Sequence, residues 1–475
     1  MASSSETSET TTSPAVDARD VCDVAIVGAG PGGLAAALAL QRRGYDVRVF
    51  ERREAFRPAG VAVFIWPHGL EHLKRIDAAT CARVVAAGAA IDTIAVERLD
   101  PGATEPEELL TIDVAGWSER MDLPPQIGIT WARLTDALRA GLEPGTVRLG
   151  HALDGVRDDA AEGVTLTFAP TRSGAPAPPP ARARLCVVGA DGRDSRVRAA
   201  AFGESLENSV EERAADASAS AANDANVYYA LCPNPPPGHG ANGFVKCANE
   251  LRFSLSDGAG ISLLDVGRGN LDLPSANDDA SFDAFDEANV DPALGQLMFG
   301  TTRFAERRMV FEDAADRLKH LKGMFAETTP LISAAIESAN ADAVIQTTLY
   351  ERNGAKRWSS GRVALLGDAA HCMYPSLGLG ISTAFADAVE LDAQLRRVKD
   401  DDTRRMDVRD ALAAYSRNRA PYARALQTVS RVMHAVLAAT AEKPATPASR
   451  RSSAFDPSAA FFKMWRGALW VFGDR

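Results

Sequence analysis

The sequence predicts an α/β fold in which a mostly parallel sheet is assembled from separated segments, an antiparallel sheet is inserted, and helices follow near the C-terminal end. Three observations support this prediction. Apolar runs typical of buried strands lead into glycine-containing turns at residues 28–33, 189–192 and 367–368. Short strand-like runs follow one another between residues 227 and 266. Beyond residue 380 the apolar residues take helical spacing.

The first turn has the pattern of a nucleotide-binding unit. The apolar run at residues 24–27 is followed by Gly-Ala-Gly-Pro-Gly-Gly, then by a helical stretch and a second strand at residues 47–50. Gly28 permits the tight turn, Gly30 lets the backbone approach a pyrophosphate, and Gly33 allows close packing of helix on strand. Glu51 ends the second strand, where a carboxylate can bind ribose hydroxyls. A purely structural glycine turn is the alternative.

Two later turns carry carboxylates at strand ends. Asp191 follows the run at residues 185–188, and Asp368 follows Gly367 after the run at residues 363–366. Asp-Gly also forms ordinary turns, so Asp191 alone would indicate only structure. A glycine-flanked segment at residues 378–381 then begins a long helix. Backbone amides at such a helix start favour negative charge on a ligand.

In this order, the three blocks resemble the FAD-dependent aromatic-hydroxylase group, the single-component flavoprotein monooxygenases typified by p-hydroxybenzoate hydroxylase. The resemblance spans about residues 21–440. It implies a Rossmann-like FAD-binding domain made of separated segments, with an inserted antiparallel-sheet substrate domain and C-terminal helices. The expected FAD-binding segments are residues 21–75, 118–200 and 345–396, and the substrate domain comprises 76–117 and 201–344. Helices are expected over 397–440, with a disordered tail at 1–20 and a further tail at 441–475.

The resemblance also implies non-covalently bound FAD and the residues around it. Asp368 matches the acid that holds the ribityl chain, and the amides of residues 378–381 would face the flavin ring. Trp131 stands where the family usually has an arginine, so Arg133, two residues on, is the substitute to examine. The implied cofactor-binding residues are Gly28, Gly30, Pro31, Gly33, Glu51, Arg52, Arg133, Asp191, Gly367, Asp368, Gly378, Leu379, Gly380 and Ile381. No catalytic side chain and no metal ligand is assigned.

The resemblance implies a monooxygenase that uses NADH or NADPH as a transient co-substrate and O2 to hydroxylate or epoxidise a small organic, aromatic or polycyclic, substrate. The sequence has no second glycine-rich nucleotide unit, as expected when the pyridine nucleotide binds only transiently. A flavin-dependent reductase or epoxidase acting on isoprenoids is one alternative. A non-enzymatic FAD-binding protein is the other.

Composition narrows the class of protein. A formal net charge of −11 and the lack of a basic stripe argue against a nucleic-acid partner. The six cysteines form no Cys-x-x-Cys pair and indicate reduced core thiols. The sequence has no run of eighteen apolar residues that could span a membrane, and its first twenty residues lack an apolar signal core. We therefore expect a cytoplasmic protein, with organellar import still open and the oligomeric state unknown.

Overall fold

The computed structural model describes thirteen stretches of the chain. They are residues 20–56, 61–98, 106–159, 162–203, 225–234, 249–256, 259–268, 295–303, 311, 313–325, 329–349, 351–399 and 406–442. The two expected tails lie outside the described residues, except for Asp20 and residues 441–442.

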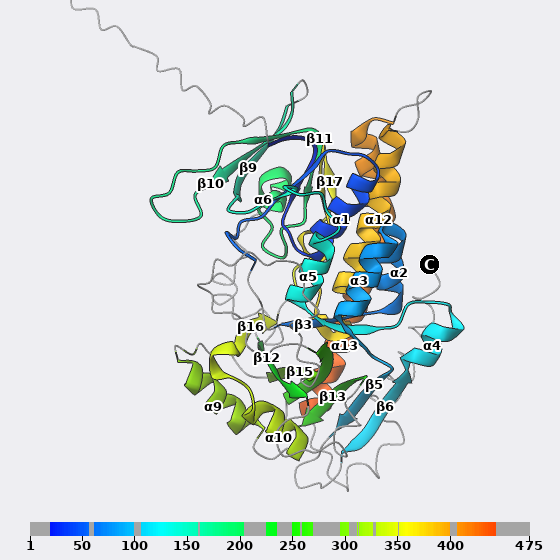
Figure 1. Ribbon diagram of the computed structural model, residues 1–475, viewed down its shortest axis with the longest axis vertical. Helices are drawn as coiled ribbons and strands as arrows, with labels where there is room; N and C mark the ends of the chain where they lie inside the picture. Colours follow the sequence, from blue (N-terminus) through cyan, green and yellow to red (C-terminus); the bar gives the residue numbers. More distant parts are fainter. Residues whose placement is uncertain are drawn as a thin grey trace, which may run out of the picture.

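An eight-stranded sheet forms the upper body in Figure 1. Its main path runs β17 (Ser359–Ser360), β18 (Val363–Leu365), β11 (Ala181–Gly189), β1 (Val21–Val27), β2 (Val47–Phe50) and β8 (Val147–Arg148). The five strands from β18 to β8 are mutually parallel, and β9 (Ala152–Asp159) and β10 (Gly163–Ala169) continue antiparallel from β11. The continuous apolar runs seen in the sequence therefore become buried parallel strands.

A group of helices packs beside this sheet (Figure 1). α1 (Pro31–Arg42) contacts α12 (Gly380–Lys399) and α5 (Trp131–Arg139), and α12 contacts α2 (Pro67–Ile76) and α13 (Val408–Glu442). α3 (Ala78–Ala87) packs on α2 and α5. The small residues of α1 are buried against these neighbours, which allows the close approach of α1 to α12. Pro421 lies inside α13.

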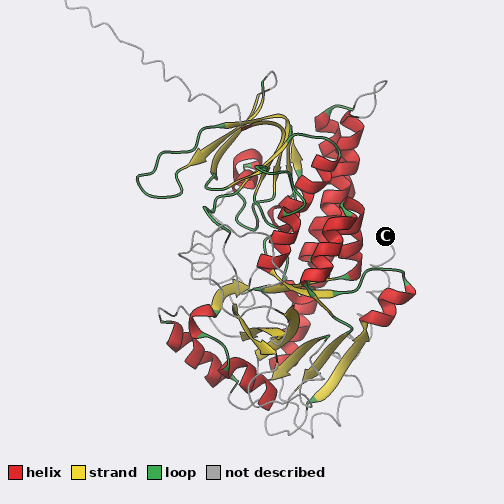
Figure 2. Ribbon diagram, viewed as in Figure 1, coloured by secondary structure: helices red, strands yellow, loops and turns green. Residues whose placement is uncertain are grey.

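A seven-stranded sheet forms the lower body. Its order is β16 (Ile345–Leu349), β12 (Ala225–Asn234), β15 (Gly295–Arg303), β14 (Ala259–Arg268), β13 (Glu250–Ser256), β5 (Thr93–Arg98) and β6 (Glu107–Asp113). Every neighbouring pair is antiparallel except β13 with β5. α9 (Ala314–Met324) and α10 (Pro330–Glu337) share an apolar core with β12 and β14, and Figure 2 shows these helices beside the strands.

Two elements join the bodies. The short sheet β3 (Ala62–Ile65), β7 (Ile127–Thr130) and β4 (Ala89–Ala90) contacts β14, and α13 touches both β18 above and β13 and β14 below. α4 (Val114–Arg120) packs on β5, and α6 (Arg196–Phe202) packs on β9, β11 and β18. The junction between the bodies is therefore built from segments far apart in sequence.

The predicted fold class is confirmed: an α/β nucleotide-type body, an antiparallel sheet and C-terminal helices are all present. Two elements fall across the expected domain ranges. β16 pairs with β12 of the lower sheet although residues 345–396 were expected in the upper body. α3 packs with upper-body helices although residues 76–117 were expected in the substrate domain. β13 and β14 pair antiparallel, with Ser256 opposite Ala259.

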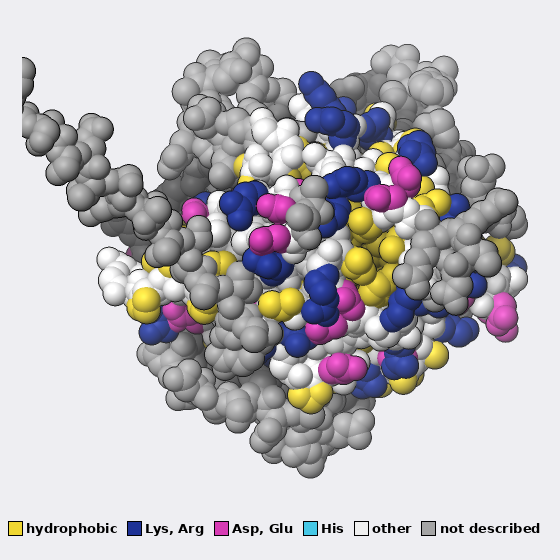
Figure 3. All heavy atoms as spheres, turned by 90° about the horizontal axis from the view of Figure 1, so that it is seen from above, with side chains coloured by type: hydrophobic (Ala, Val, Ile, Leu, Met, Phe, Trp, Pro, Cys, Tyr) yellow, Lys and Arg dark blue, Asp and Glu magenta, His cyan; other side chains and the backbone are white. Residues whose placement is uncertain are grey.

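Two expectations from the sequence concern membrane-spanning helices and the distribution of surface charge. No helix within the described ranges combines the length and the apolar character needed to cross a lipid bilayer. On the face seen in Figure 3, the described Lys and Arg side chains are interspersed with Asp and Glu. That mixture differs from the basic stripe that binding to a phosphate backbone requires.

Candidate functional site

The predicted turns meet at one edge of the upper sheet. Val27 at the end of β1 pairs with Gly189 of β11, and Gly189 pairs with Leu365 of β18. The turns that follow these parallel strands therefore lie side by side, as expected at the carboxyl edge of such a sheet. They border a cavity of about 610 Å³ that extends to the lower sheet. Twelve predicted residues line it: Gly28, Gly30, Pro31, Gly33, Glu51, Arg52, Asp191, Gly367, Asp368, Gly378, Gly380 and Ile381.

The glycines of the first turn serve two different purposes. Gly28 has φ +105°, and a Cβ at Gly28 would collide with the carbonyl of Ala190. A Cβ at Gly33 would collide with the carbonyl of Gly28. Gly30, in contrast, has φ −73°, which any residue can adopt, and an added Cβ would meet no protein atom within 4 Å. Neither the backbone nor protein packing excludes a side chain at Gly30, so the open space there fits a ligand.

The start of α1 faces this open space. Gly30 is the N-cap and provides no side-chain hydrogen bond, and Pro31 occupies the first turn. The first amides of a helix lack internal partners and carry partial positive charge. This end of α1 can therefore bind the phosphate oxygens of a dinucleotide.

Glu51, which follows β2, accepts hydrogen bonds from backbone amides, one of them in the first turn. Its Oε2 accepts a hydrogen bond from the Ala29 amide at 2.9 Å, and its Oε1 accepts one from the Arg53 amide at 3.0 Å. Each carboxylate oxygen can accept a second hydrogen bond, so ribose hydroxyls could still bind. Arg52 lies beside it, exposed at the cavity wall.

Asp191 lines the cavity but is already engaged by α6. Its Oδ1 accepts from the Ser195 hydroxyl at 2.5 Å, and its Oδ2 accepts from the amides of Arg196 and Val197 at 2.7 and 3.1 Å. Burial raises the pKa of the Asp191 carboxyl above its usual value, although these hydrogen bonds oppose the shift. The structure thus gives Asp191 a capping role, and its predicted contact with the cofactor stays a prediction.

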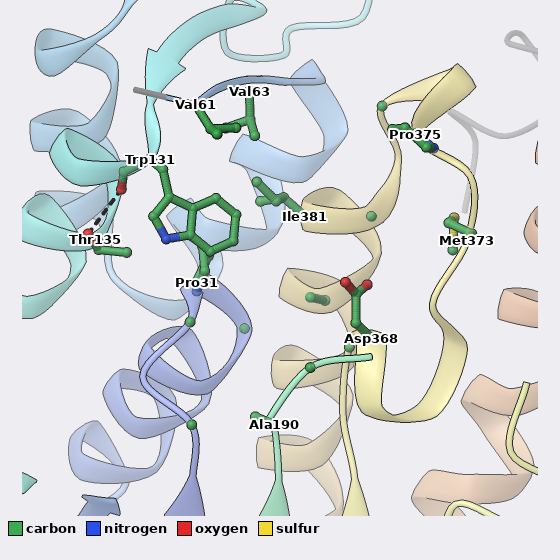
Figure 4. Close-up of a pocket in the computed structure, with 18 of the residues that line it drawn as sticks. Pro31, Val61, Val63, Trp131, Thr135, Ala190, Asp368, Met373, Pro375 and Ile381 are labelled. Carbon is green, nitrogen blue, oxygen red and sulfur yellow. Dashed lines mark hydrogen bonds between the residues drawn. The ribbon is translucent and has the colours of Figure 1, made fainter. Parts of the chain in front are cut away.

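Asp368 differs because its carboxylate projects into the cavity (Figure 4). The Asp368 side chain is solvent-exposed within this space, although protein atoms surround it closely enough to affect its pKa. Burial raises the pKa of the Asp368 carboxyl, while the nearby His371 and Arg193 partly oppose that effect. A carboxylate in such a position gains by accepting hydrogen bonds from ligand hydroxyls.

A buried ion network supports the turn that carries Asp368. Asp387 of α12 accepts from the Gly367 amide at 3.2 Å and lies 2.6 Å from His371 Nε2 and 2.8 Å from Arg419 Nε. Burial alone would raise the pKa of Asp387, but the charges and hydrogen bonds of His371 and Arg419 lower it to about 2. The network therefore ties the turn to both α12 and α13. The sequence showed Asp387 on a helix, but it gave no sign of these partners.

The segment before α12 forms another wall. A Cβ at Gly378 would overlap the ring of Phe64, and Gly378 has φ +60°. Gly380 resembles Gly30: a Cβ added to it would meet no protein atom within 4 Å. Leu379 is not among the residues that line the cavity and packs into the apolar core shared with α13.

Arg133 also lies away from the cavity lining. Its Nη1 donates to the carbonyl of Val266 in β14 at 2.9 Å. Trp131 lines the cavity instead, and Figure 4 shows its indole projecting between Pro31 and Val61. The Thr135 hydroxyl donates to the Trp131 carbonyl at 2.9 Å within α5. At this position the aromatic side chain, rather than the nearby guanidinium, faces the ligand space.

The lower part of the cavity contains residues that the sequence did not identify. η5 (Pro375–Leu377) contributes Ser376, and α13 contributes His434, whose Nδ1 lies 3.3 Å from the Ser376 hydroxyl. The His434 ring stacks on Tyr374 with centroids 4.2 Å apart. Tyr229 lines the cavity, whereas its neighbour Tyr228 joins the core under α9, as strand alternation requires.

The geometry defines a dinucleotide-cofactor site that opens onto a largely apolar chamber. In the described ranges, no group of three or more His, Cys, Asp and Glu side chains is placed to hold a metal ion. The five described cysteines are buried and free of disulfides, as expected.

Comparison with known proteins gives the class. The family model described as "FAD binding domain" matches residues 21–238 and 328–430, and the chain belongs to this family. A FAD-dependent urate hydroxylase of Mycolicibacterium vanbaalenii is 25% identical over 82% of this chain and 82% of its own length. An aurachin C monooxygenase/isomerase of Stigmatella aurantiaca is 25% identical over 78% of this chain and 79% of its own. The predicted resemblance to p-hydroxybenzoate hydroxylase-like flavoprotein monooxygenases is thus confirmed.

Solved structures share the fold. Klebsiella pneumoniae HpxO complexed with FAD and uric acid superposes with a TM-score of 0.66 at 20% identity, covering 94% of this chain and 92% of the other. The residues present in this chain fit FAD: a helix start for phosphate, a carboxylate at the end of β2, and the cavity-facing Asp368. The space at Gly30 and Gly380, which no protein atom fills, supports the same conclusion.

Proposed function

We propose that this protein is an NAD(P)H-dependent FAD monooxygenase that uses O2 to hydroxylate or epoxidise a small aromatic or polycyclic compound. The observation that carries the proposal is one continuous cavity, which joins the cofactor site at the upper sheet to the apolar surface of the lower sheet. A compound bound there would lie beside the cofactor, and the walls would exclude water. Membership of the FAD-dependent hydroxylase family supports the same reaction class.

Different parts of the site would bind different parts of FAD. The α1 start and Glu51 would hold the adenosine diphosphate half of FAD, and Asp368 would accept hydrogen bonds from ribityl hydroxyls. The amides at the start of α12, left accessible by Gly380, would face the flavin ring and favour negative charge on it. When bound, FAD would supply the redox chemistry: with two electrons from NADH or NADPH, one oxygen atom of O2 would go to the substrate and the other would leave as water.

The test couples reductant use to oxygen transfer. Purified FAD-loaded protein is mixed with NADH or NADPH and a panel of phenols, aromatic acids, polycyclic compounds and isoprenoids, under air and then under labelled oxygen. We expect slow oxidation of the reductant alone, faster oxidation with a substrate, and one labelled oxygen atom in the product.

Other outcomes would identify the alternatives. A saturated product formed without oxygen would replace the proposal with a reductase. If no compound stimulated NAD(P)H oxidation across the panel, a non-enzymatic FAD-binding protein would be the better account. Asp392→Ala, which removes a partner of Arg43 outside the cavity lining, should leave both NAD(P)H oxidation and oxygen transfer unchanged.

A further inference from the structure

The two sides of the cavity differ sharply in charge. Seven charged residues occur among the described lining residues, and all belong to the upper, nucleotide-binding body: Glu51, Arg52, Arg53, Asp191, Asp194, Arg196 and Asp368. β12, β13, β14, β15, η5 and α13 contribute none to the described lining. A bound compound that extends toward the lower sheet therefore meets no counter-ion among these residues.

The lower wall is apolar and aromatic. β13 contributes Leu251, Phe253 and Leu255, β14 contributes Leu264, and α13 contributes Leu437. In Figure 4, Met373 and Pro375 lie across the cavity from Val61 and Trp131. An ionised carboxylate moved from water to such a wall loses hydration and gains no charged partner in return. The walls instead favour flat apolar groups.

One corner of this wall is polar. We call Tyr229, Tyr374, Ser376 and His434 the polar corner; they come from β12, the segment leading into η5, η5 itself and α13. Stacking on Tyr374 fixes the plane of the His434 ring, and Ser376 lies within hydrogen-bond distance of its Nδ1. The Tyr374 carbonyl accepts from the Ser430 hydroxyl at 2.6 Å, which anchors the segment to α13. The corner is therefore held by contacts among three elements.

Tyr229 packs against the small cluster formed by Val227 and Tyr374. Burial raises the pKa of the Tyr229 hydroxyl to about 12, so the group stays protonated at neutral pH and can donate a hydrogen bond. A hydroxyl, amine or carbonyl could therefore find both donors and acceptors at the corner.

We propose that the lower side of the cavity binds an uncharged, largely apolar ring compound with one hydroxyl, amino or carbonyl group, and that the polar corner contacts that group. His434 and Ser376 are then specificity-determining residues. The inference rests on the proposed function only in calling this compound the substrate. Binding of the compound can be measured without turnover.

Isothermal titration calorimetry on the FAD-loaded protein at neutral pH tests the preference. The probes are two matched pairs: salicylamide with salicylate, and naphthol with hydroxynaphthoate. We expect each neutral compound to bind about tenfold or more tightly than its carboxylate, a difference of about 1.4 kcal/mol. Equal or tighter binding of the carboxylates would overturn the proposal. Absence of binding by both neutral compounds at millimolar concentration would overturn it as well.

Variants test the polar corner. Ser376→Ala and His434→Leu should each weaken naphthol binding by about tenfold, because a hydrogen-bonding group is lost from a buried contact. His434→Asn, which keeps an acceptor near the position of Nδ1, should retain part of the affinity. Val432→Ala, on the exposed side of the same helix, should leave it unchanged. The FAD content of each variant reports whether the cofactor site is intact.

Unchanged naphthol affinity in both Ser376→Ala and His434→Leu would remove the polar corner from recognition. The two proposals fail separately, since calorimetry uses no NAD(P)H. A protein that prefers the neutral compounds but never consumes NAD(P)H would reject the oxygenase and keep the inference about the ligand.

Discussion

The upper and lower sides of the cavity are built on different principles. The upper side places charges and backbone amides at fixed strand ends and helix starts. The buried network of Asp387, His371 and Arg419 stabilises the turn at Gly367. The lower side is a sheet surface of apolar side chains with one polar corner. On the proposals above, the cofactor would be bound through backbone geometry and charge, whereas the substrate would be selected by side-chain shape and by the absence of charged side chains from the described lower wall.

The largest effect should come from breaking the support of the upper side. Asp387→Ala leaves the buried His371 and Arg419 without their carboxylate, so we expect the free energy of unfolding to fall by about 3–5 kcal/mol in urea titrations. Asp392→Ala removes a partly exposed pair with Arg43 and should cost at most about 1 kcal/mol. Similar losses of unfolding free energy in the two variants would mean that the buried network stabilises the fold no more than a surface ion pair does.

The second-largest effect is expected from removing the carboxylate of Asp368, which faces the cavity. Asp368→Ala loses two charge-assisted hydrogen bonds to ribityl hydroxyls, so FAD should bind about 100-fold more weakly, equivalent to about 3 kcal/mol. Fluorescence titration of the cofactor-free protein measures this, and thermal unfolding checks that the fold persists. If FAD binds as in the wild type, Asp368 is not a cofactor ligand and the upper side has been misassigned.

A smaller effect is expected where a side chain enters the ligand space. Gly380→Val should weaken FAD binding about tenfold by filling room that no protein atom occupies, or should lower the flavin reduction potential. Gly323→Val in α9 is a matched control, because a Cβ there also meets no protein atom and Gly323 is not in the cavity lining. Wild-type affinity and potential in Gly380→Val would refute the proposed amide contact.

The smallest effect should be a dependence of FAD affinity on pH. The pKa of Asp368 is raised in the cofactor-free protein, and hydrogen bonds from FAD would favour the ionised form and lower it. Affinity should therefore be full above the raised pKa and decline as acidity increases through it, because the protonated form must first release its proton. Asp368→Asn should bind weakly with little change over the same acidic range. Equal pH profiles in the two proteins would contradict this linkage.

The upper side could be predicted from sequence because most of its predicted residues directly follow a buried strand. Gly28, Gly30 and Gly33 follow a strand directly, and Glu51 and Asp368 end strands whose apolar runs are visible in the sequence. Local spacing fixes where such residues lie relative to the backbone. Two predicted residues lie outside the cavity lining: Arg133 donates to the Val266 carbonyl of β14, and Leu379 packs into the apolar core. A shift of one or two residues on a helix turns a side chain to another face.

The lower side could not be predicted in the same way. His434 and Ser376 are 58 residues apart and meet only because α13 crosses behind η5. Neither residue stands in a motif, and α13 shows only a helical pattern in the sequence. Asp387 and Arg419 pose the same difficulty, since their pairing depends on how α12 packs against α13. Contacts of this kind arise from tertiary packing, for which a single sequence has no local signal.

The open space at Gly380 has a consequence for the evolution and engineering of this fold. Alanine at Gly380 would clash with nothing in the protein and would restrict the unfolded chain, a change that stabilises proteins by about 0.4–1 kcal/mol when the backbone conformation is compatible. Selection for heat resistance in the cofactor-free protein should therefore favour this substitution. If Gly380 faces the flavin as proposed, selection on the cofactor-loaded protein should reject it, so stability and activity would demand different residues at Gly380.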